Sequence, residues 1–589
     1  MAVLSQYDYL FAIGTIFAGL DAWNIGANDV ANSWATSVAS QSVTYLQAMV
    51  LASIMEFAGS VGVGARVADT IRTKIVDTTL FNDDPALLML GMVCAVTASS
   101  IYLTMATKIG LPVSTTHSIM GGVIGMGVAA VGADGVQWVG KGPGTGAINS
   151  GVVQVFLAWI IAPGLSAIFA SIIFLITKYG VMLRKNPVWK AFVYVPIYFG
   201  LAASLLTMLL LWKGGNYEVN LTNAQLPGVI VAVGVGFALL VCVTLMPWLY
   251  RVVMLDDWQL RWYHIPIGLF LLRRGPVPEN PDDDYEDEPV QELTPKDELA
   301  ASKAAQRGDV EISAAGALPE KTVANADSTD GASADAAAGP VRRKKPSDFR
   351  KPHKKLLTGR PEGKWYTWPV MWYGIKWAFL HGIDQDVVNL AGQKSALAGD
   401  VEEIHAHAAR YDNKAEYMYS FLQVMTAATA SFTHGANDIA NAIGPYATVF
   451  EIWNSGVLPE TGKAAVPTWI LCFGAAMLVL GIWTYGYNIM RNLGNRLTLQ
   501  SPSRGFSMEL GSAITVILAT RLKLPVSTTQ CITGATVGVG LCSGTWRTVN
   551  WRMVGWIYFG WFITLPVAGI ISGCLMGIII NAPRWGYSG

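Results

Sequence analysis

The chain has 589 residues, of which 52% are hydrophobic and only 14% are charged, and its formal net charge is zero. Soluble domains carry about a quarter charged residues, so this composition excludes an ordinary soluble protein and indicates a polytopic membrane protein. A neutral chain also argues against nucleic acid as a partner, because nucleic-acid-binding domains are strongly basic.

Apolar segments recur along the chain at the length that a bilayer requires, roughly 20 residues for a hydrocarbon core of about 30 Å. Seven segments precede a charged region and five follow it, so we expect an all-α polytopic membrane protein with about 12 membrane segments in two halves, residues 1–250 and 417–589. The segments lie near residues 7–27, 45–65, 86–108, 112–131, 152–177, 192–212, 227–250, 417–450, 468–490, 508–522, 525–541 and 553–580.

The region between the halves, residues 251–364, opens with the acidic run "PDDDYEDE" and closes with the basic run "VRRKKPSDFRKPHKK". Its low hydrophobicity and mixed charge predict a charged, largely disordered loop. Basic residues beside a membrane segment favour the cytoplasm. Residues 365–416 follow, and their aromatic stretch "WYTWPVMWYGIKWAFL" predicts amphipathic helices that lie at the membrane interface.

A cytoplasmic loop after seven segments places both termini outside the cell. We therefore expect a multi-pass plasma-membrane protein. The sequon "NLT" at 220–222 falls in an outer loop under this topology, and the sequence leaves open whether Asn220 is glycosylated.

Two motifs occur once in each half and in the same order. "GANDVANS" at 26–33 returns as "GANDIANA" at 435–442, and "LPVSTTHSIMGGVIGMG" at 111–127 returns as "LPVSTTQCITGATVGVG" at 524–540. By the segment count, the two copies enter the membrane from opposite sides. This predicts two inverted repeats, the architecture of secondary transporters, with a site near the membrane midplane.

The first motif places a carboxylate, Asp29 or Asp438, within apolar sequence, where it costs about 3 kcal/mol unless it has a partner. No Lys or Arg lies within a helical turn of either aspartate, so a bound hard cation is the simplest partner. We expect Gly26 and Gly435 to let the helix unwind and free backbone carbonyls as further ligands. The alternative is that the asparagines only hydrogen-bond neighbouring helices. The predicted cation ligands are Asp29, Asp438, Asn32 and Asn441.

The second motif predicts an anion site, because proline suits the first turn of a helix and free N–H groups at a helix N-terminus attract anions. The short apolar segments on either side predict two re-entrant helical hairpins with proline at the tip. Two such tips would aim hydroxyls at one tetrahedral oxyanion. The alternative is an ordinary proline-kinked helix whose hydroxyls satisfy freed carbonyls. The predicted anion ligands in these tips are Ser114, Thr115, Thr116, Ser527, Thr528 and Thr529.

Two glutamates outside the motifs, Glu56 and Glu509, also lie within apolar sequence. Each is a candidate for a further cation or proton site, because ionisable residues inside a membrane are usually functional. The alternative is that they pair across the bundle with Arg66, Arg72 or Arg491.

The paired motifs resemble those of the inorganic phosphate transporter (PiT) family of sodium–phosphate symporters, and the "DYEDE" and "HGIDQDVV" stretches resemble its fungal branch. The likeness covers roughly 7–250 and 417–580. It implies import of phosphate driven by sodium, with sodium as co-substrate and no cofactor. It also implies that Asn28 and Asn437 belong to the phosphate site and that Glu56 and Glu509 are needed for transport.

Three other functions remain as hypotheses: proton-coupled transport, transport of a related oxyanion such as sulfate or arsenate, and a phosphate sensor that binds without flux. An enzyme is the weakest hypothesis, because the sequence shows no nucleophile–base pair. The expected partners are phosphate, sodium and the lipid bilayer. The sequence leaves open a homodimer and cytoplasmic regulators of the 251–364 loop.

Overall fold

The computed structural model describes residues 3–64, 78–81, 83–140, 151–213, 221–222, 224–278, 357, 359–385, 387, 399, 401–458, 466–521 and 526–582. In these ranges the protein is helical and has no β-strand, and the only β-type pairing is an isolated bridge between Ala408 and Gly544. The all-α prediction is therefore confirmed for the part of the chain that the structure describes.

Each predicted membrane segment coincides with a helix. These helices are α1 (Asp8–Ala39), α2 (Tyr45–Val63), α4 (Pro85–Ile109), α5 (Thr115–Val131), α6 (Val152–Thr177), α7 (Pro187–Lys213), α8 (Gln225–Leu249), α14 (Asn413–Ser455), α15 (Thr468–Leu493), α16 (Pro502–Arg521), α17 (Thr528–Ser543) and α18 (Trp551–Asn581). Shorter helices are α9 (Gly268–Leu271), α11 (Trp368–Leu380) and α13 (Val401–Ala406).

Eight of the described helices are long and apolar enough to cross a membrane. The exceptions among the predicted segments are α5 and α17, which are short, and α14 and α16, which carry many polar residues. The number of twelve membrane segments stays a prediction.

Local sequence explains where the helices begin and end. The Asp84 side chain caps α4 by accepting a hydrogen bond from the Leu87 amide at 3.2 Å, with Pro85 in the first turn. Gly110 ends the same helix at a left-handed φ of 75°, a conformation that glycine adopts without strain. Ser114 caps α5, so the chain turns sharply between two helices at residues 110–114.

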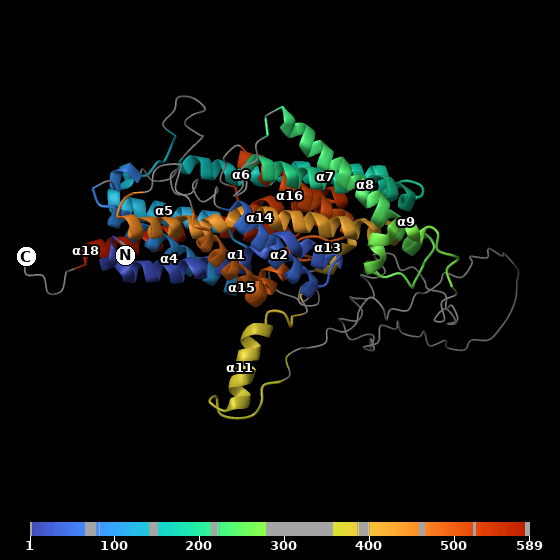
Figure 1. Ribbon diagram of the computed structural model, residues 1–589. Helices are drawn as coiled ribbons and strands as arrows, with labels where there is room; N and C mark the ends of the chain where they lie inside the picture. The colour runs from blue at the N-terminus through green and yellow to red at the C-terminus, as the bar shows by residue number, and fades with distance from the viewer. Residues whose placement is uncertain are drawn as a thin grey trace, which may run out of the picture.

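The two motif helices, α1 and α14, run antiparallel through the middle of the bundle (Figure 1). Near one end Trp453 donates a hydrogen bond to the Asp8 carboxylate at 2.8 Å, and near the other end Ser40 donates to Gln423 at 2.7 Å. Residue numbers therefore rise along α1 as they fall along α14. An inverted repeat requires this relation of its two motif helices; the inversion of the complete halves stays a prediction.

Helices α4 and α5 form an antiparallel hairpin whose backbones touch, since a side chain at Gly122 would overlap the Ala95 carbonyl. The turn of this hairpin lies beside the middle of α1, where Asn28 donates to the Leu111 carbonyl at 3.1 Å. Helices α16 and α17 are the corresponding pair in the second half, but their turn, with Pro525, lies outside the described residues. That these hairpins are re-entrant stays a prediction.

The two motif helices are buried by packing against helices of the opposite half of the chain. Helix α1 packs on α15, and α14 packs on α2. A side chain at Gly26 would overlap the Leu478 carbonyl, and one at Gly435 would overlap the Glu56 carbonyl. Both helices run unbroken through the motif. The expectation that these glycines unwind the helix is therefore wrong, because they serve close helix–helix contact instead.

We expect Gly26→Ala to destabilise the protein, because its methyl group must push α1 and α15 apart and overpacking costs about 1–3 kcal/mol. The measurement is the melting temperature in detergent, followed by fluorescence-detected size-exclusion chromatography. Gly62→Ala on α2 is the control, since nothing lies within 4 Å of its added carbon. Equal melting temperatures for the two variants would contradict the packing role.

The first part of the predicted disordered loop is folded. Arg251 lies 3.0 Å from the Asp257 carboxylate and donates to the carbonyls of Leu271, Arg274 and Gly275 at 3.2, 2.8 and 2.8 Å. These bonds hold residues 251–278 against the end of α8. The prediction took residues 251–364 as one region, and the acidic run that gave this region its disordered character begins only after residue 278. Residues 279–356 lie outside the described part of the chain.

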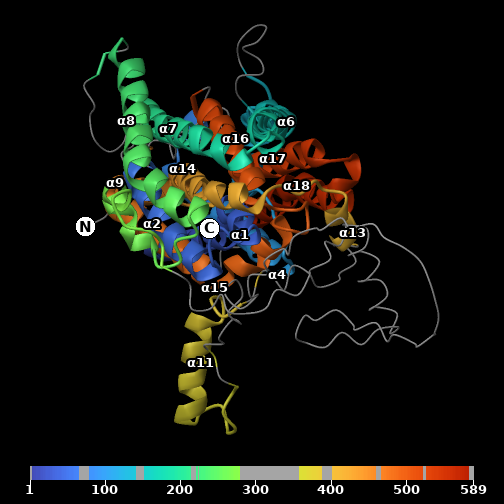
Figure 2. The ribbon, with the colours of Figure 1, turned by 90° about the vertical axis from the view of Figure 1, so that its right-hand side faces the viewer.

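Helix α11 stands away from the bundle in both views (Figures 1 and 2). Exposed tryptophans lie just before the helix and at its first residue, with Trp365 76% and Trp368 69% accessible. Tryptophan is enriched at membrane–water interfaces. An interfacial position would bury these exposed rings in the membrane surface, and this position of the segment stays a prediction.

Candidate functional site

The carboxylate of Asp29 lies in the middle of α1 and is 1% exposed. It accepts hydrogen bonds from Thr115 at 2.9 Å, from Thr529 at 3.2 Å and from Asn32 at 3.3 Å. Thr115 is the first residue of α5 and Thr529 is the second residue of α17. One buried carboxylate therefore receives hydroxyl groups from both hairpins.

Asp438 occupies the corresponding place on α14 and is equally buried. It accepts hydrogen bonds from Thr528 at 2.8 Å and from Asn437 at 2.8 Å. Thr528 is the first residue of α17, as Thr115 is of α5. Each aspartate is thus bonded to the leading threonine of the hairpin in its own half.

The second asparagine of each motif bonds the hairpin of the opposite half. Asn32 donates to Thr529 at 2.9 Å and more weakly to Thr528 at 3.4 Å. In the same way, Asn441 donates to Thr116 at 3.1 Å and to Thr115 at 3.2 Å. These reciprocal bonds join α1, α14 and both hairpins around one point.

The first asparagine of the first motif holds the hairpin turn in place. The Asn28 side chain accepts from the Val113 amide at 3.2 Å and donates to Leu111 and to the Thr107 hydroxyl at 3.1 and 3.2 Å. In this structure its amide is therefore engaged with the turn of α4 and α5. A direct contact of Asn28 with phosphate stays a prediction, as it does for Asn437.

The serines of the second motif sit just before the helices. Ser114 caps α5 by accepting from the His117 amide at 3.2 Å, and Ser527 precedes α17 in the same position. The N-termini of α5 and α17 therefore both lie at the aspartates. Their positive dipole ends stabilise negative charge there, whether the charge belongs to a carboxylate or to a bound anion.

A histidine that sequence analysis passed over lies at the centre of this site. His434 Nε2 is 2.9 Å from the Asp438 carboxylate and 3.7 Å from that of Asp29, and Nδ1 is 2.7 Å from the Glu56 carboxylate. All four side chains are buried. Asp29, His434 and Asp438 also form a group that could hold a metal ion. The available signal was the spacing, because His434 precedes Asp438 by one helical turn.

Glu56 therefore belongs to the same site. It accepts from Ser431 at 2.9 Å and lies against His434. Of the arginines suggested as its partners, Arg66 and Arg72 lie outside the described residues. Within the described part of the chain, its basic neighbour is the imidazole of His434 on α14.

Glu509 forms a separate buried cluster between α1, α14 and α16. It accepts from Thr36 at 2.5 Å, Ser37 at 2.8 Å, Thr426 at 2.5 Å and Gln423 at 3.3 Å. These partners are all neutral, and no arginine pairs with this carboxylate in the part of the chain that the structure describes. The cluster continues along α1 and α14, away from the aspartates, and could pass a cation or a proton.

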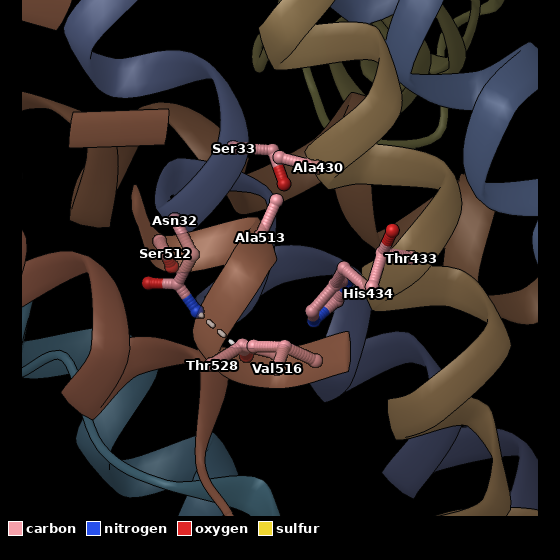
Figure 3. A pocket seen from close by; sticks show the side chains of 9 residues that line it. All are labelled: Asn32, Ser33, Ala430, Thr433, His434, Ser512, Ala513, Val516 and Thr528. Carbon is pink, nitrogen blue, oxygen red and sulfur yellow. Dashed lines mark hydrogen bonds between the residues drawn. The ribbon is translucent and has the colours of Figure 1, made fainter. Parts of the chain in front are cut away.

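A small cavity of about 20 Å³ lies beside His434 and Thr528, two residues that contact the Asp438 carboxylate. Figure 3 shows the Asn32 amide bonded to Thr528 at its edge, with His434 and Thr433 facing it from α14. The Oδ1 atom of Asn32 is buried without a hydrogen-bond partner in the described residues. The cavity is lined by Asn32, Ser33, Ala430, Thr433, His434, Ser512, Ala513, Val516 and Thr528.

The fold and the site define a polytopic helical membrane protein with a buried site of carboxylates, hydroxyls and one imidazole. A profile of the phosphate transporter family matches residues 25–572, and the chain belongs to that family. The predicted family is therefore confirmed. Because this family and the similar permease described next are transporters, the chain is a transporter and not an enzyme.

Individual relatives agree with this family. The chain is 71% identical over 596 residues to the phosphate-repressible phosphate permease pho-4 of Neurospora crassa, and the match covers 100% of both chains. It is 27% identical to the mouse sodium-dependent phosphate transporter 1, covering 97% of this chain and 96% of that protein. A solved structure described as "The sodium-dependent phosphate transporter" has the same fold, with a TM-score of 0.61, 24% identity, and coverage of 98% of this chain and 100% of that chain.

Proposed function

We propose that this protein imports inorganic phosphate together with sodium, by alternating access around Asp29 and Asp438. The observation that carries the proposal is the bond from the leading threonine of each hairpin to an aspartate, Thr115 to Asp29 and Thr528 to Asp438. The name of the mouse relative, sodium-dependent phosphate transporter 1, supports sodium as the driving ion.

The geometry suggests how sodium and phosphate depend on each other. In this structure the threonine hydroxyls donate to the carboxylates, so their protons are not available to an anion. A sodium ion bound by a carboxylate would take the place of that proton. The hydroxyl could then donate to a phosphate oxygen while its own oxygen faces the cation. Cation binding would thus create anion donors and reduce the repulsion of phosphate by Asp29 and Asp438.

Phosphate also requires the hairpins to move. The cavity beside His434 and Thr528, about 20 Å³, has room for roughly one water-sized particle, and phosphate is several times larger. Reciprocal bonds from Asn32 and Asn441 hold each motif helix to the opposite hairpin. Separation of these contacts on one side at a time would expose the site alternately, as in transporters built from repeats.

The remaining parts of the proposal concern the cell. We propose a plasma-membrane location, both termini outside and the 251–364 loop in the cytoplasm, where regulators could bind it. Sodium is the co-substrate, and no cofactor is needed by this mechanism. A homodimer is a further proposal, and Asn220 lies outside the described residues.

Proton coupling is the second candidate, and His434 favours it. The imidazole lies between the carboxylates of Glu56 and Asp438, so it could carry a proton through the transport cycle in place of a sodium ion. Sulfate or arsenate transport and a sensor without flux are weaker candidates, because the matching family and the similar permease are named for phosphate transport.

The deciding experiment is uptake of radiolabelled phosphate into proteoliposomes that contain the purified protein. An inward sodium gradient should drive accumulation, whereas a potassium gradient should not. Accumulation driven by a proton gradient without sodium would replace the leading proposal with proton coupling. Saturable binding without uptake under any gradient would favour the sensor.

We expect Thr528→Val to raise the phosphate KM about tenfold to a hundredfold, because a hydrogen bond to a charged group contributes about 1.5–3 kcal/mol. The matched control is Thr536→Val on the same helix, whose hydroxyl donates to the Ile532 carbonyl one turn back, at 2.8 Å. KM is measured at saturating sodium. An unchanged phosphate KM with an altered sodium dependence would assign the Thr528 hydroxyl to the cation alone.

A further inference from the structure

A third buried aspartate lies on α1 outside the site described above. Asp21 is 0% exposed and precedes Asp29 by about two helical turns. Its Oδ2 atom has no hydrogen-bond partner in the described residues, and its Oδ1 atom lies 3.5 Å from the Ser100 hydroxyl on α4, at the limit of a hydrogen bond. No ion pair to Asp21 occurs within the described ranges. The transport mechanism proposed above does not use it.

Two other buried oxygens on the same face also lack partners. Asn24 follows Asp21 by three residues, so both side chains lie on one side of α1. The Oδ1 atom of Asn24 and the hydroxyl of Ser99 on α4 have no partner in the described part of the chain, and both residues are 0% exposed. The Ser99 hydroxyl lies beside the Asp21 carboxylate, and Asn24 contacts Ser100, so the three residues lie together between α1 and α4. Buried polar atoms without partners are rare in proteins.

The orientation of the Asn24 amide is fixed by its neighbours. Its Nδ2 atom donates to the carbonyl of Leu20 at 3.0 Å, to the carbonyl of Ser100 at 3.3 Å and to the Thr104 hydroxyl at 2.9 Å. Carbonyl oxygens accept hydrogen bonds and cannot donate them, so this end of the amide must be the nitrogen. The unpartnered atom is therefore an oxygen, which is a ligand for a cation and not for an anion.

The internal repeat gives these residues a position relative to the site. Aligning the two "GAND" segments places Asp21 opposite Ala430 and Asn24 opposite Thr433, and aligning the two "LPVSTT" segments places Ser99 opposite Ser512. Ala430, Thr433 and Ser512 line the small cavity described above. The first half thus carries a carboxylate and an amide where the second half has a methyl group and a hydroxyl beside a cavity.

We propose that Asp21, Asn24 and Ser99 form a second sodium site between α1 and α4. Carboxylate, amide and hydroxyl oxygens are the ligands that hard cations take. A bound cation also removes the cost of an isolated carboxylate among apolar helices. The site lies nearer than Asp29 to the beginning of α1, so it would hold an ion on its way to or from the Asp29 and Asp438 site. The choice of sodium as the cation rests on the proposed function. The cation site itself is argued from the oxygen atoms and does not rest on that function.

The test counts sodium ions bound to the purified full-length protein by equilibrium dialysis with radiolabelled sodium, in the absence of phosphate. Asp21→Asn should bind one sodium ion fewer than the wild type. Ser99→Ala should bind the same number, but the affinity for one of these ions should fall several-fold. Asp134→Asn, an exposed carboxylate in the loop after α5, is the control and should bind as the wild type does. If Asp21→Asn keeps the number and affinity of bound sodium ions, Asp21 is protonated or purely structural and the proposal is overturned.

A parallel arm separates this inference from the proposed function. Loss of a sodium ion in Asp29→Asn but not in Asp21→Asn would overturn the second site and leave the transport site intact. Loss in Asp21→Asn but not in Asp29→Asn would support the second site and contradict the assignment of Asp29. If Asp21→Asn does not fold, the Ser99→Ala result decides, since unchanged sodium affinity in that variant overturns the proposal.

Discussion

Asp29→Asn and Asp438→Asn should each abolish sodium-driven phosphate uptake while the protein still reaches the membrane. The substitution keeps the shape of the side chain and one oxygen, so Thr115 and Thr528 retain an acceptor. It removes the charge that attracts a cation. A coupling free energy between two sites acts equally in both directions. Loss of the bound cation must therefore lower the affinity for phosphate by the factor by which phosphate raises the affinity for the cation. We therefore expect sodium-enhanced phosphate binding to vanish together with uptake.

Calorimetric titration of phosphate into the purified variants, with and without sodium, measures this coupling directly. Asp83→Asn, an exposed carboxylate before α4, is the matched control and should behave as the wild type. Wild-type sodium dependence in both aspartate variants would show that the two carboxylates only hold the hairpins in place. The proposed mechanism would then be wrong at its first step.

The sequence predicted the grouping of the site because duplicated motifs carry information that a single motif does not. Asp29 and Asp438 need partners in apolar surroundings, and the "LPVSTT" segments offer hydroxyls next to a proline. Their meeting in space follows from two copies arranged around one centre. The reciprocal bonds of Asn32 and Asn441 are the structural form of that symmetry.

The helix geometry could not be predicted in the same way. Glycine permits both an unwound helix and a close contact between helices, and the choice depends on which helix lies opposite. For Gly26 the opposite backbone is that of Leu478 on α15, more than 400 residues away in sequence. Local sequence does not show which residue lies opposite Gly26. It therefore could not distinguish close packing, which the structure has, from an unwound helix.

His434 was missed for a related reason. No lysine or arginine lies within a helical turn of either aspartate, so a bound cation was the expected partner. Histidine one turn before Asp438 lies on the same helical face, but the first copy of the motif has Ile25 in its place. Comparison of the two copies points only to residues that both copies share, and His434 occurs in one copy. Its partner Glu56 comes from α2, which the repeat also does not relate to α14.

The pair of His434 and Glu56 gives the second large prediction. Breaking a buried, hydrogen-bonded charge pair by removing one partner costs about 3–5 kcal/mol, because the other charge is left without compensation. His434→Gln removes the imidazole from the Glu56 carboxylate and leaves it the hydrogen bond from the Ser431 hydroxyl. We expect this variant to melt several degrees below the wild type and to lose uptake. Glu56→Gln should also lower the melting temperature and abolish uptake, because it leaves the His434 imidazole without the Glu56 carboxylate.

The double variant separates stability from transport. With both residues replaced, Glu56 no longer leaves an unpaired charge beside α14, so the melting temperature should rise above that of His434→Gln. The part of the loss that comes from Asp438, which also loses its imidazole neighbour, should remain. The size of this recovery is the interaction energy of the pair. Uptake should not recover, because the imidazole also lies 2.9 Å from Asp438, where the proposed cation binds. Additive losses in melting temperature would show that the two side chains do not interact. Recovery of uptake together with stability would reduce the pair to a structural role and leave sodium coupling to the aspartates alone.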